Sequence, residues 1–271
     1  MRIWSKNHAL VMKMNEEHDG VLFVDNFTSD LTDDEFAKML GAVVPEDDED
    51  EDGDGEGEDA SRGLSDDGND GRRHLQAGAV NWVTAGKVHP VKDQGECGSC
   101  WAFAAVLAQE SMQAIKDGTS PVRLSEQQCV ECSVDYNGCY GGWMYYCWQH
   151  SKDQGMMSNA DYPYTALYTT CMYDSSLTIS HADSWGKCLT PAAAVTQLQS
   201  GPLAIAVAAD NSCWRFYSSG VLTSADGCPT DLDHAVNIVG YEPGMIIWKK
   251  QLVCKWMTWL HYQKSVCLSG Y

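Results

Sequence analysis

The first forty residues carry apolar side chains at helical spacing, then an extended run, then a second helical signal. Val21 to Val24 has the pattern of a short strand. Thr32 and Glu35 have the spacing of a capping box, which predicts a second helix starting at Thr32. The positions that recur at helical spacing before the strand are Trp4, Leu10, Val11 and Met14.

Two further patterns place chemically useful side chains at the start of an element. An apolar helical pattern begins at Cys100, runs towards Ile115 and is stopped near Gly118. Much later, an apolar strand pattern follows His234 directly. We therefore expect a cysteine on the first turn of a long helix and a histidine at the head of a strand.

The composition of the 271 residues changes this picture mainly through one acidic segment. Residues 46–70 hold fourteen Asp or Glu and one Arg, a net −13 of the formal −20, with almost nothing to bury, which predicts a disordered linker. The rest carries no basic stripe, so we predict no nucleic-acid binding. Its longest apolar runs, 101–108 and 202–209, are far shorter than the ~20 residues that cross a bilayer, so we predict no membrane span.

The acidic segment also contains a calcium-loop spacing, which we interpret as accidental. Gly55 stands where such loops have an aliphatic residue, and Pro45 would break the preceding helix. Arg72 and Arg73 end the segment and offer an exposed cleavage site. The residues on calcium-loop spacing are Asp48, Asp50, Asp52, Gly53 and Asp59.

Twelve cysteines in a chain of this length predict an oxidising compartment and several disulfides. Cys97 with Cys100, and Cys129 with Cys132, have two-residue spacing, so a zinc ribbon or a redox centre is the alternative. Residues 1–20 contain no apolar signal-peptide core, and we expect upstream sequence to be missing.

Residues 91–103, Val-Lys-Asp-Gln-Gly-Glu-Cys-Gly-Ser-Cys-Trp-Ala-Phe, carry the chemistry. Small residues before Cys100 allow a tight turn, and the helix N-terminus with a nearby imidazolium can lower a cysteine pKa from ~8.5 to about 3 to 7. A thiolate attacks a peptide carbonyl, and the resulting oxyanion needs donors. The side-chain amide of Gln94 and the backbone N–H of Cys100 can supply them.

This segment resembles the active-site region of papain and the cathepsins, and residues 232–241, Leu-Asp-His-Ala-Val-Asn-Ile-Val-Gly-Tyr, resemble the family's histidine strand. The resemblance implies a cysteine endopeptidase with Cys100 as nucleophile, His234 as its proton-transfer partner and Gln94 as oxyanion donor, with no cofactor or metal. It also implies an α+β fold of two domains. A helical domain carries Cys100, a β-barrel domain carries His234, and the active-site cleft lies between them.

The resemblance extends to disulfides and to substrate binding. Leu124-Ser-Glu-Gln matches another family segment, and the pairs that the family implies are Cys97–Cys139 and Cys132–Cys171. Gly141 and Gly142 would pair with an extended substrate peptide. The positions that line the family's main specificity pocket are Trp143, Met144, Ala206 and Ala235, which predicts a bulky apolar side chain two places before the scissile bond.

The start of the chain resembles part of the inhibitory prosegment of the same family. Trp4-x2-Asn7-x3-Val11-x3-Asn15 matches the second half of one prosegment signature, and Asn26 with Asp30 matches the next in part. We therefore expect a partial prosegment at 1–40, an acidic linker with the activation site at 41–76, and a peptidase domain at 77–271. Within that domain, 77–190 is expected to be mainly helical and 191–271 to be rich in strands.

After Tyr241 the resemblance ends, and the sequence diverges beyond residue 242. The family's histidine-orienting Asn aligns near Leu252, with Gln251 beside it, so no residue takes that role. Strands that close the barrel are also missing, and we expect the right domain to be incomplete, with an open edge. Pairing stays open for seven cysteines, including a possible Cys188–Cys213 bridge: Cys129, Cys147, Cys188, Cys213, Cys228, Cys254 and Cys267.

The expected partners are protein or peptide substrates and the chain's own prosegment. We expect the protein to be a monomer and to work in an endolysosomal, vacuolar or extracellular compartment. One rival hypothesis is a catalytically impaired homologue that acts as a binding or decoy protein, favoured by the lost Asn. Another is thiol–disulfide exchange through Cys97 and Cys100, which would require those two sulfurs to bridge each other.

Overall fold

The computed structural model describes residues 2–45, 78–133, 138–188, 190–220, 222 and 231–242, with strand segments at 245–249, 257–258 and 267–270. Several expectations concern residues outside these ranges and stay predictions. They are the acidic linker with its calcium-like spacing, the Arg72-Arg73 site, Cys228, Cys254, Gln251 and Leu252.

The N-terminal segment, residues 2–45, folds as helix, strand and helix, as its pattern predicts. α1 (Arg2–Glu17) buries Asn7, Val11 and Met14, whereas Trp4 is 44% exposed and stacks on the ring of His8. α2 (Asp33–Ala37) begins with the predicted capping box at Thr32. β1 (Val21–Phe23) pairs antiparallel with β7 (Tyr217–Gly220), so this segment is attached to the rest of the chain by a strand pair.

The helical half is built around α3 (Cys100–Lys116), which is buried along most of its length. The helix ends as predicted, with Gly118 at φ +68° just beyond it. α4 (Glu126–Cys132) and α5 (Met144–Gln154) contact α3, and η4 (Gly138–Tyr140) lies between them in the chain. The short elements that follow are β3 (Met156–Met157), η5 (Ser175–Leu177) and β4 (Thr178–Ser180).

The other half is a seven-stranded sheet in the order β10-β9-β8-β6-β11-β5, with β2 also paired to β8. The resemblance implies a β-barrel, but the described strands form an open sheet, because β10 and β5 each pair on one side only. α6 (Pro191–Leu198) contacts β5, β6 and β8, and α7 (Ser212–Phe216) precedes β7. The strands are β2 (Val80–Asn81), β5 (Trp185–Cys188), β6 (Leu203–Val207), β8 (His234–Glu242), β9 (Met245–Lys249), β10 (Met257–Thr258) and β11 (Cys267–Gly270).

Alternation along β6 divides the buried side chains between two cores. Ala204 and Ala206 pack with α3, while Leu203, Ile205 and Val207 pack with Val11, Met14 and Phe23 of the N-terminal segment. Period-two alternation therefore lets one strand face both the helices and the N-terminal segment.

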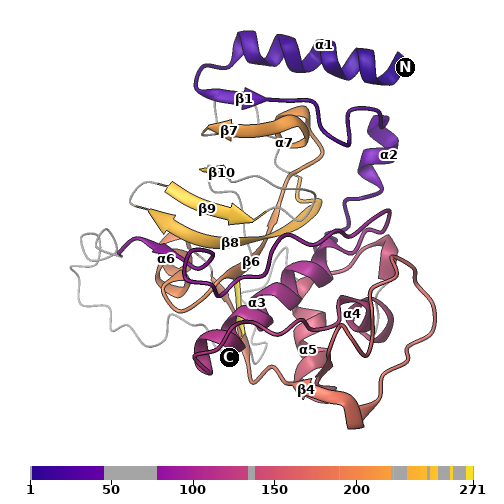
Figure 1. Cartoon of the computed structure of the whole chain (residues 1–271), viewed down its shortest axis with the longest axis vertical. Coiled ribbons are helices and arrows are strands. Elements are labelled where there is room, and N and C mark those ends of the chain that lie inside the picture. Colours follow the sequence, from indigo (N-terminus) through magenta and orange to yellow (C-terminus); the bar gives the residue numbers. More distant parts are fainter. Residues whose placement is uncertain are drawn as a thin grey trace.

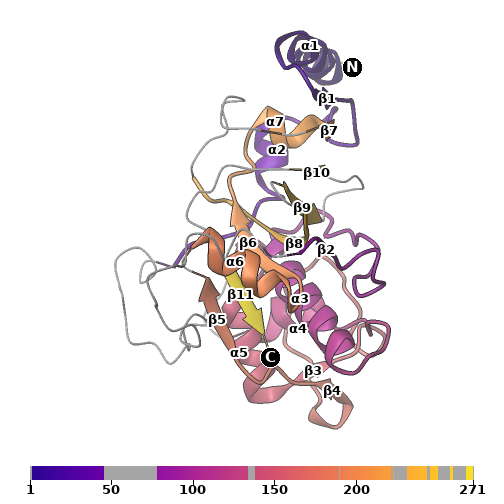
Figure 2. The ribbon, with the colours of Figure 1, turned by 90° about the vertical axis from the view of Figure 1, so that its left-hand side faces the viewer.

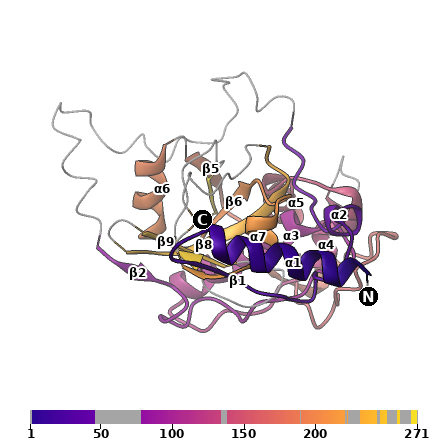
Figure 3. The same cartoon turned by 90° about the horizontal axis from the view of Figure 1, so that it is seen from above.

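The figures show how the N-terminal segment, the sheet and the helices are arranged in space. α1 and β1 lie at one end and α5 with β4 at the other, with the sheet and α3 between them (Figures 1 and 2). Seen from the first end, α1 runs across the molecule beside β1 (Figure 3). No helix among the described residues has the length and apolar character needed to span a bilayer.

Candidate active site

Cys100 is the first residue of α3 and is fully buried. A tight loop precedes it: the backbone N–H of Gly98 donates to the carbonyl of Cys139 at 2.8 Å, and a Cβ at Gly98 would lie 2.7 Å from that same oxygen. The disulfide Cys97–Cys139, with S–S 2.09 Å, fixes the loop from behind. Small residues and one bridge thus hold the thiol at the head of the helix.

His234 is the first residue of β8 and is fully buried. The backbone N–H of the following residue, Ala235, donates to Cys100 Sγ at 3.4 Å, so the start of β8 contacts the start of α3 although the two residues are 135 positions apart. β8 is aligned by β6, where Val207 is the register partner of His234. The ring of Trp214 meets the His234 ring edge-on, with centroids 6.3 Å apart.

Gln94 is fully buried, and both hydrogens of its side-chain amide are used. Nε2 donates to the carbonyl of Cys97 at 2.9 Å, within its own loop, and to the carbonyl of Met39 at 2.8 Å. The first contact orients the amide. The second shows that this donor binds a peptide carbonyl, here one of the N-terminal segment.

Residues 39–43 lead from the turn after α2 across the site, with an isolated β-bridge at Ala42. Gly142 N donates to the Gly41 carbonyl at 3.0 Å, and Val43 N donates to the Gly142 carbonyl at 3.1 Å, which forms a parallel bridge. On the opposite side, Ala42 N donates to the carbonyl of Asp233 at 3.0 Å. Hence the backbone expected to pair with substrate, at Gly142, is occupied by the chain's own N-terminal segment.

The Cys100 thiol differs electrostatically from the sequence expectation. Burial raises the pKa of Cys100 to about 12, although backbone amides at Ala235, Gly41 and Trp101 act to lower the pKa. The sequence predicted a lowered pKa at the helix N-terminus. The loss of water around the thiolate raises the pKa by more than these amides lower it. Burial at this position therefore favours the neutral thiol over the thiolate.

Comparison with known proteins settles the family. A family model described as "Papain family cysteine protease" matches residues 77–256, which is most of the chain. The chain belongs to the papain family. Digestive cysteine proteinase 2 of Homarus americanus is 40% identical over 183 residues, covering 64% of this chain and 56% of that protein. Vignain of Ricinus communis is 42% identical over 170 residues, covering 60% and 46%. This chain thus spans about half the length of the curated relatives that it matches.

Solved papain-family precursors match almost the whole chain. Digestive procathepsin L2 of Tenebrio molitor is 26% identical with TM-score 0.83, covering 99% of this chain and 91% of that one. A recombinant stem bromelain precursor is 25% identical with TM-score 0.81, covering 99% and 89%. Because both are precursors and the match includes residues 2–45, the N-terminal segment is an intramolecular prosegment.

The residues expected to line the papain-family specificity pocket pack in the same buried cluster as Cys100. Ala206 and Ala235 are register partners across β6 and β8. Trp143 and Met144 begin α5, and all four share one buried cluster with Cys100. Gly141, at φ +125°, has a backbone conformation that favours glycine, and the next residue, Gly142, forms the bridge to Ala42.

The described disulfides include both pairs that the resemblance implies. Cys97–Cys139 and Cys132–Cys171 are present. Since Cys97 is joined to Cys139, thiol–disulfide exchange between Cys97 and Cys100 is excluded. A third bridge, Cys129–Cys147, links α4 to α5. The Cys188–Cys213 bridge is absent, because Cys188 is a buried free thiol aligned in register with Cys267.

Three polar residues to which the sequence analysis assigned no role form hydrogen bonds around Cys100, His234 and Gln94. Asn237, buried in β8, donates to the Ala104 carbonyl of α3 at 2.9 Å and so joins the strand of His234 to the helix of Cys100. Asp233 accepts from the backbone of Ala209 and Asp210. The hydroxyl of Tyr164 donates to the Gln94 carbonyl at 2.8 Å and lies 2.6 Å from Ser99 Oγ. The available signal was a lone amide in an otherwise apolar strand.

Proposed function

We propose that this chain is the precursor of a cysteine endopeptidase in which Cys100 attacks peptide bonds, His234 transfers the proton and Gln94 stabilises the oxyanion. One observation carries the proposal: the buried Gln94 amide donates to the Met39 carbonyl, and two residues later the backbone N–H of Gly41 reaches the Cys100 thiol. A donor already placed on a carbonyl oxygen is what acyl transfer requires.

The mechanism follows from these positions. Once the cleft opens to water, the Cys100 proton passes to His234, and the thiolate attacks the carbonyl carbon to form a C–S bond. The oxyanion accepts from Gln94 Nε2 and the Cys100 backbone N–H. His234 then protonates the leaving amine as the C–N bond breaks. Water, deprotonated by His234, hydrolyses the resulting thioester and returns the thiol.

The prosegment blocks this chemistry by occupying both binding elements. The Met39 carbonyl takes the Gln94 donor, and Gly41 and Val43 take the Gly142 backbone. These contacts extend past residue 40, so we place the end of the inhibitory part at about Val43. The linker to residue 76, with cleavage at Arg72-Arg73, would then release it.

A bulky apolar side chain is the proposed preference two places before the scissile bond. The apolar cluster of Ala206, Ala235 and Met144 beside Gly142 supports this. Processed enzyme should cleave a Leu-Arg reporter faster than an Arg-Arg reporter. Faster cleavage of Arg-Arg would contradict the assignment of the pocket.

The proposed compartment is endolysosomal, vacuolar or extracellular. Six described cysteines form three disulfides, which favours such an oxidising site.

The second candidate is a catalytically impaired binding protein, favoured by the divergence after Tyr241. Labelling processed protein with an epoxide thiol inhibitor at mildly acidic pH separates the two. Stoichiometric, rapid labelling of Cys100, with none in Cys100→Ser, supports the peptidase. Folded, processed protein that remains unlabelled supports the binding protein instead.

A further inference from the structure

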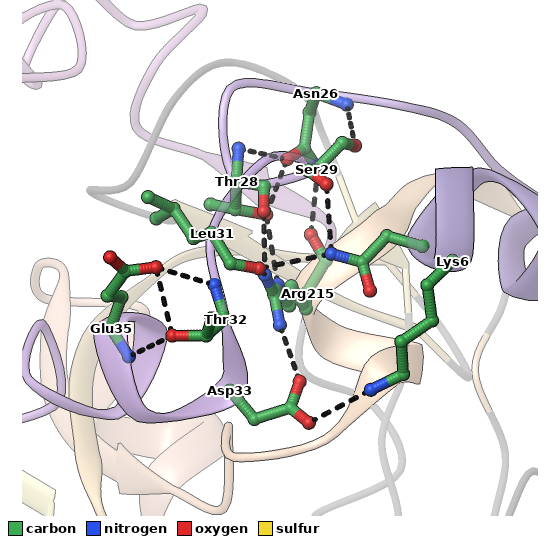
Figure 4. A network of polar contacts seen from close by, with 10 residues as sticks. Lys6, Asn26, Thr28, Ser29, Leu31, Thr32, Asp33, Glu35 and Arg215 are labelled. Atoms are coloured by element: carbon green, nitrogen blue, oxygen red, sulfur yellow. Dashed lines mark hydrogen bonds and ion pairs between the residues drawn. The ribbon is translucent and has the colours of Figure 1, made fainter. Parts of the chain in front are cut away.

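Arg215 is a buried cation of the peptidase domain whose acceptors come from the prosegment. It lies in α7 and is 4% exposed. Nη2 donates to the Thr28 and Leu31 carbonyls, both at 2.6 Å, and Nη1 donates to Asp33 Oδ1 at 3.0 Å. Figure 4 shows these acceptors gathered around the guanidinium. Among the described residues, every hydrogen-bond acceptor of this side chain belongs to residues 28–33.

Removal of the prosegment therefore changes Arg215 more than most side chains. The guanidinium loses the carbonyls, the carboxylate of Asp33 and the ring of Phe36, whose centroid lies 4.9 Å from Cζ. Within the peptidase domain, the described partners of this guanidinium are the ring of Phe216, at 5.1 Å, and the negative charge of Asp210. A buried guanidinium that loses its hydrogen-bond acceptors is unstable unless water or an anion replaces them.

The contacts of the prosegment, taken in chain order, relate Arg215 to the proposed catalytic groups. Along the chain, Leu31 contacts Arg215, Met39 contacts Gln94, and Val43 contacts Gly142. Arg215 and Gly142 thus contact the two ends of residues 31–43, and the backbone N–H of Gly41, between these ends, reaches the Cys100 thiol. α7 also borders the catalytic imidazole, because Trp214 packs on His234.

This order defines the side of the substrate that Arg215 faces. Gly142 and the apolar cluster are proposed to hold the residues before the scissile bond, so the Arg215 end receives the leaving-group side. An extended peptide covers roughly 3.3 Å per residue, so the first four residues after the bond extend ~13 Å in that direction.

We propose that Arg215 is a specificity-determining residue of the processed enzyme, binding a substrate carboxylate within four positions after the scissile bond. The inference rests on the proposed peptidase function. A planar guanidinium that now binds two carbonyls and a carboxylate binds a carboxylate with charge-assisted, bidentate hydrogen bonds. The carboxylate can belong to an Asp or Glu side chain or to a peptide C-terminus.

The test uses processed enzyme and internally quenched peptides with Leu two places before the bond. One set has an amidated C-terminus and carries Glu or Gln at each of the four positions after the bond. A second set keeps Gln but ends in a free carboxylate after the same number of residues. We expect kcat/KM to be about 3- to 10-fold higher for the carboxylate at one position, since a partly exposed ionic hydrogen bond contributes modestly.

Variants identify the residue responsible. In Arg215→Gln the carboxylate-to-amide ratio should fall to about one, and Arg215→Glu should prefer Lys over Gln at the same position. Lys116→Gln removes one positive charge at the far end of α3, roughly 24 Å from Cys100 at 1.5 Å per residue, and should keep the wild-type ratio. Ratios are measured within each enzyme, so a smaller folded fraction does not affect them.

The outcomes are distinguishable. Equal cleavage of carboxylate and amide peptides by wild type, or a preference that persists in Arg215→Gln, overturns the role of Arg215. A preference seen only with free C-termini supports the inference and identifies the terminal carboxylate as the ligand. No cleavage of any peptide by folded, processed protein overturns the proposed peptidase function and this inference with it.

Discussion

At the scale of single residues, the site depends on a few backbone and amide contacts with little room to vary. Gln94 has both amide hydrogens committed, one to Cys97 for orientation and one to the carbonyl that it stabilises. Gly41 passes so close to Gly98 that an added Cβ would lie 1.9 Å from the Gly98 oxygen. A substitution at either residue should therefore have a distinct, measurable effect.

Replacing Gln94 by Ala should lower kcat/KM of the processed enzyme by ~10²- to 10³-fold, because one of two oxyanion donors is lost. Epoxide labelling of Cys100 should persist, since the thiol and imidazole remain. Steady-state hydrolysis of a Leu-Arg reporter, normalised to labelled sites, measures the effect. A loss smaller than about threefold would mean that Gln94 is not the donor.

Gly41→Ala should weaken the hold of the prosegment on the cleft by about 1–3 kcal/mol, the usual range for overpacking. The rate of acid-induced processing of the precursor should rise accordingly. Gly78→Ala is the matched control, because a Cβ there meets no atom within 4 Å. Equal processing rates in the two variants would show that residue 41 does not lie against the nucleophile loop.

At the scale of elements, the prosegment is held by its loop before α2 more than by its surface ion pair. Asp33 is 73% exposed on its side chain, so its pair with Arg215 should contribute less than about 1 kcal/mol. The buried bonds from Arg215 to the Thr28 and Leu31 carbonyls should contribute more, because their loss leaves polar groups unsatisfied.

We therefore expect Arg215→Met in the processed enzyme to raise the inhibition constant of a peptide of residues 2–45 by ~10²-fold or more. The corresponding peptide with Asp33→Asn should change that constant by less than about fivefold against wild-type enzyme. Fluorogenic inhibition assays compare them directly. If Asp33→Asn has the larger effect, the exposed carboxylate and not the carbonyl pair holds the segment.

These elements also show what a sequence can predict. The helix at Cys100, the strand at His234 and the capping box at Thr32 follow from local periodicity and spacing, and the structure contains them. Arg215 gave no such signal, because it lies in a five-residue helix and its partners are mainly backbone carbonyls. Cys129–Cys147 could not be assigned either, since tertiary packing brings α4 and α5 together.

At the scale of the whole molecule, a buried ionic cluster links the nucleophile loop to the helical half. Lys92, two residues before Gln94, contacts both Glu110 of α3 and Glu126 of α4. Burial raises the pKa of Glu110 to about 7, with Lys92 acting in the opposite direction. Two carboxylates and one ammonium in a dry site favour keeping one proton.

The sign of the pH effect follows from that shift. A carboxyl group whose folded pKa lies above its unfolded value holds its proton more tightly when folded. Its stabilising contribution is complete below about pH 4.5 and is lost as the pH rises through about 7. Glu110→Gln should therefore reduce the loss of stability between pH 5 and pH 7. Urea unfolding of the precursor at both values measures it, and an unchanged difference would contradict a protonated Glu110.

The open sheet marks the limit of sequence reasoning at this scale. The resemblance implied a barrel, and the divergence after Tyr241 implied that closing strands are missing. The described strands do form an open sheet, yet β11 inserts between β6 and β5, a non-local pairing that no periodicity reveals. Likewise, the burial that raises the pKa of Cys100 arises only in the folded chain, so the motif around Cys100 could not show it.

The most direct test of the account is hydrolysis of a Leu-Arg reporter by processed wild-type protein and by processed Cys100→Ser. Both are cleaved by the same added protease and matched for folded fraction. We predict that wild type turns over and that Cys100→Ser loses at least about 10⁴-fold in kcat, as removal of a nucleophile does elsewhere. Equal turnover by the two proteins would contradict the assignment of Cys100 as the nucleophile.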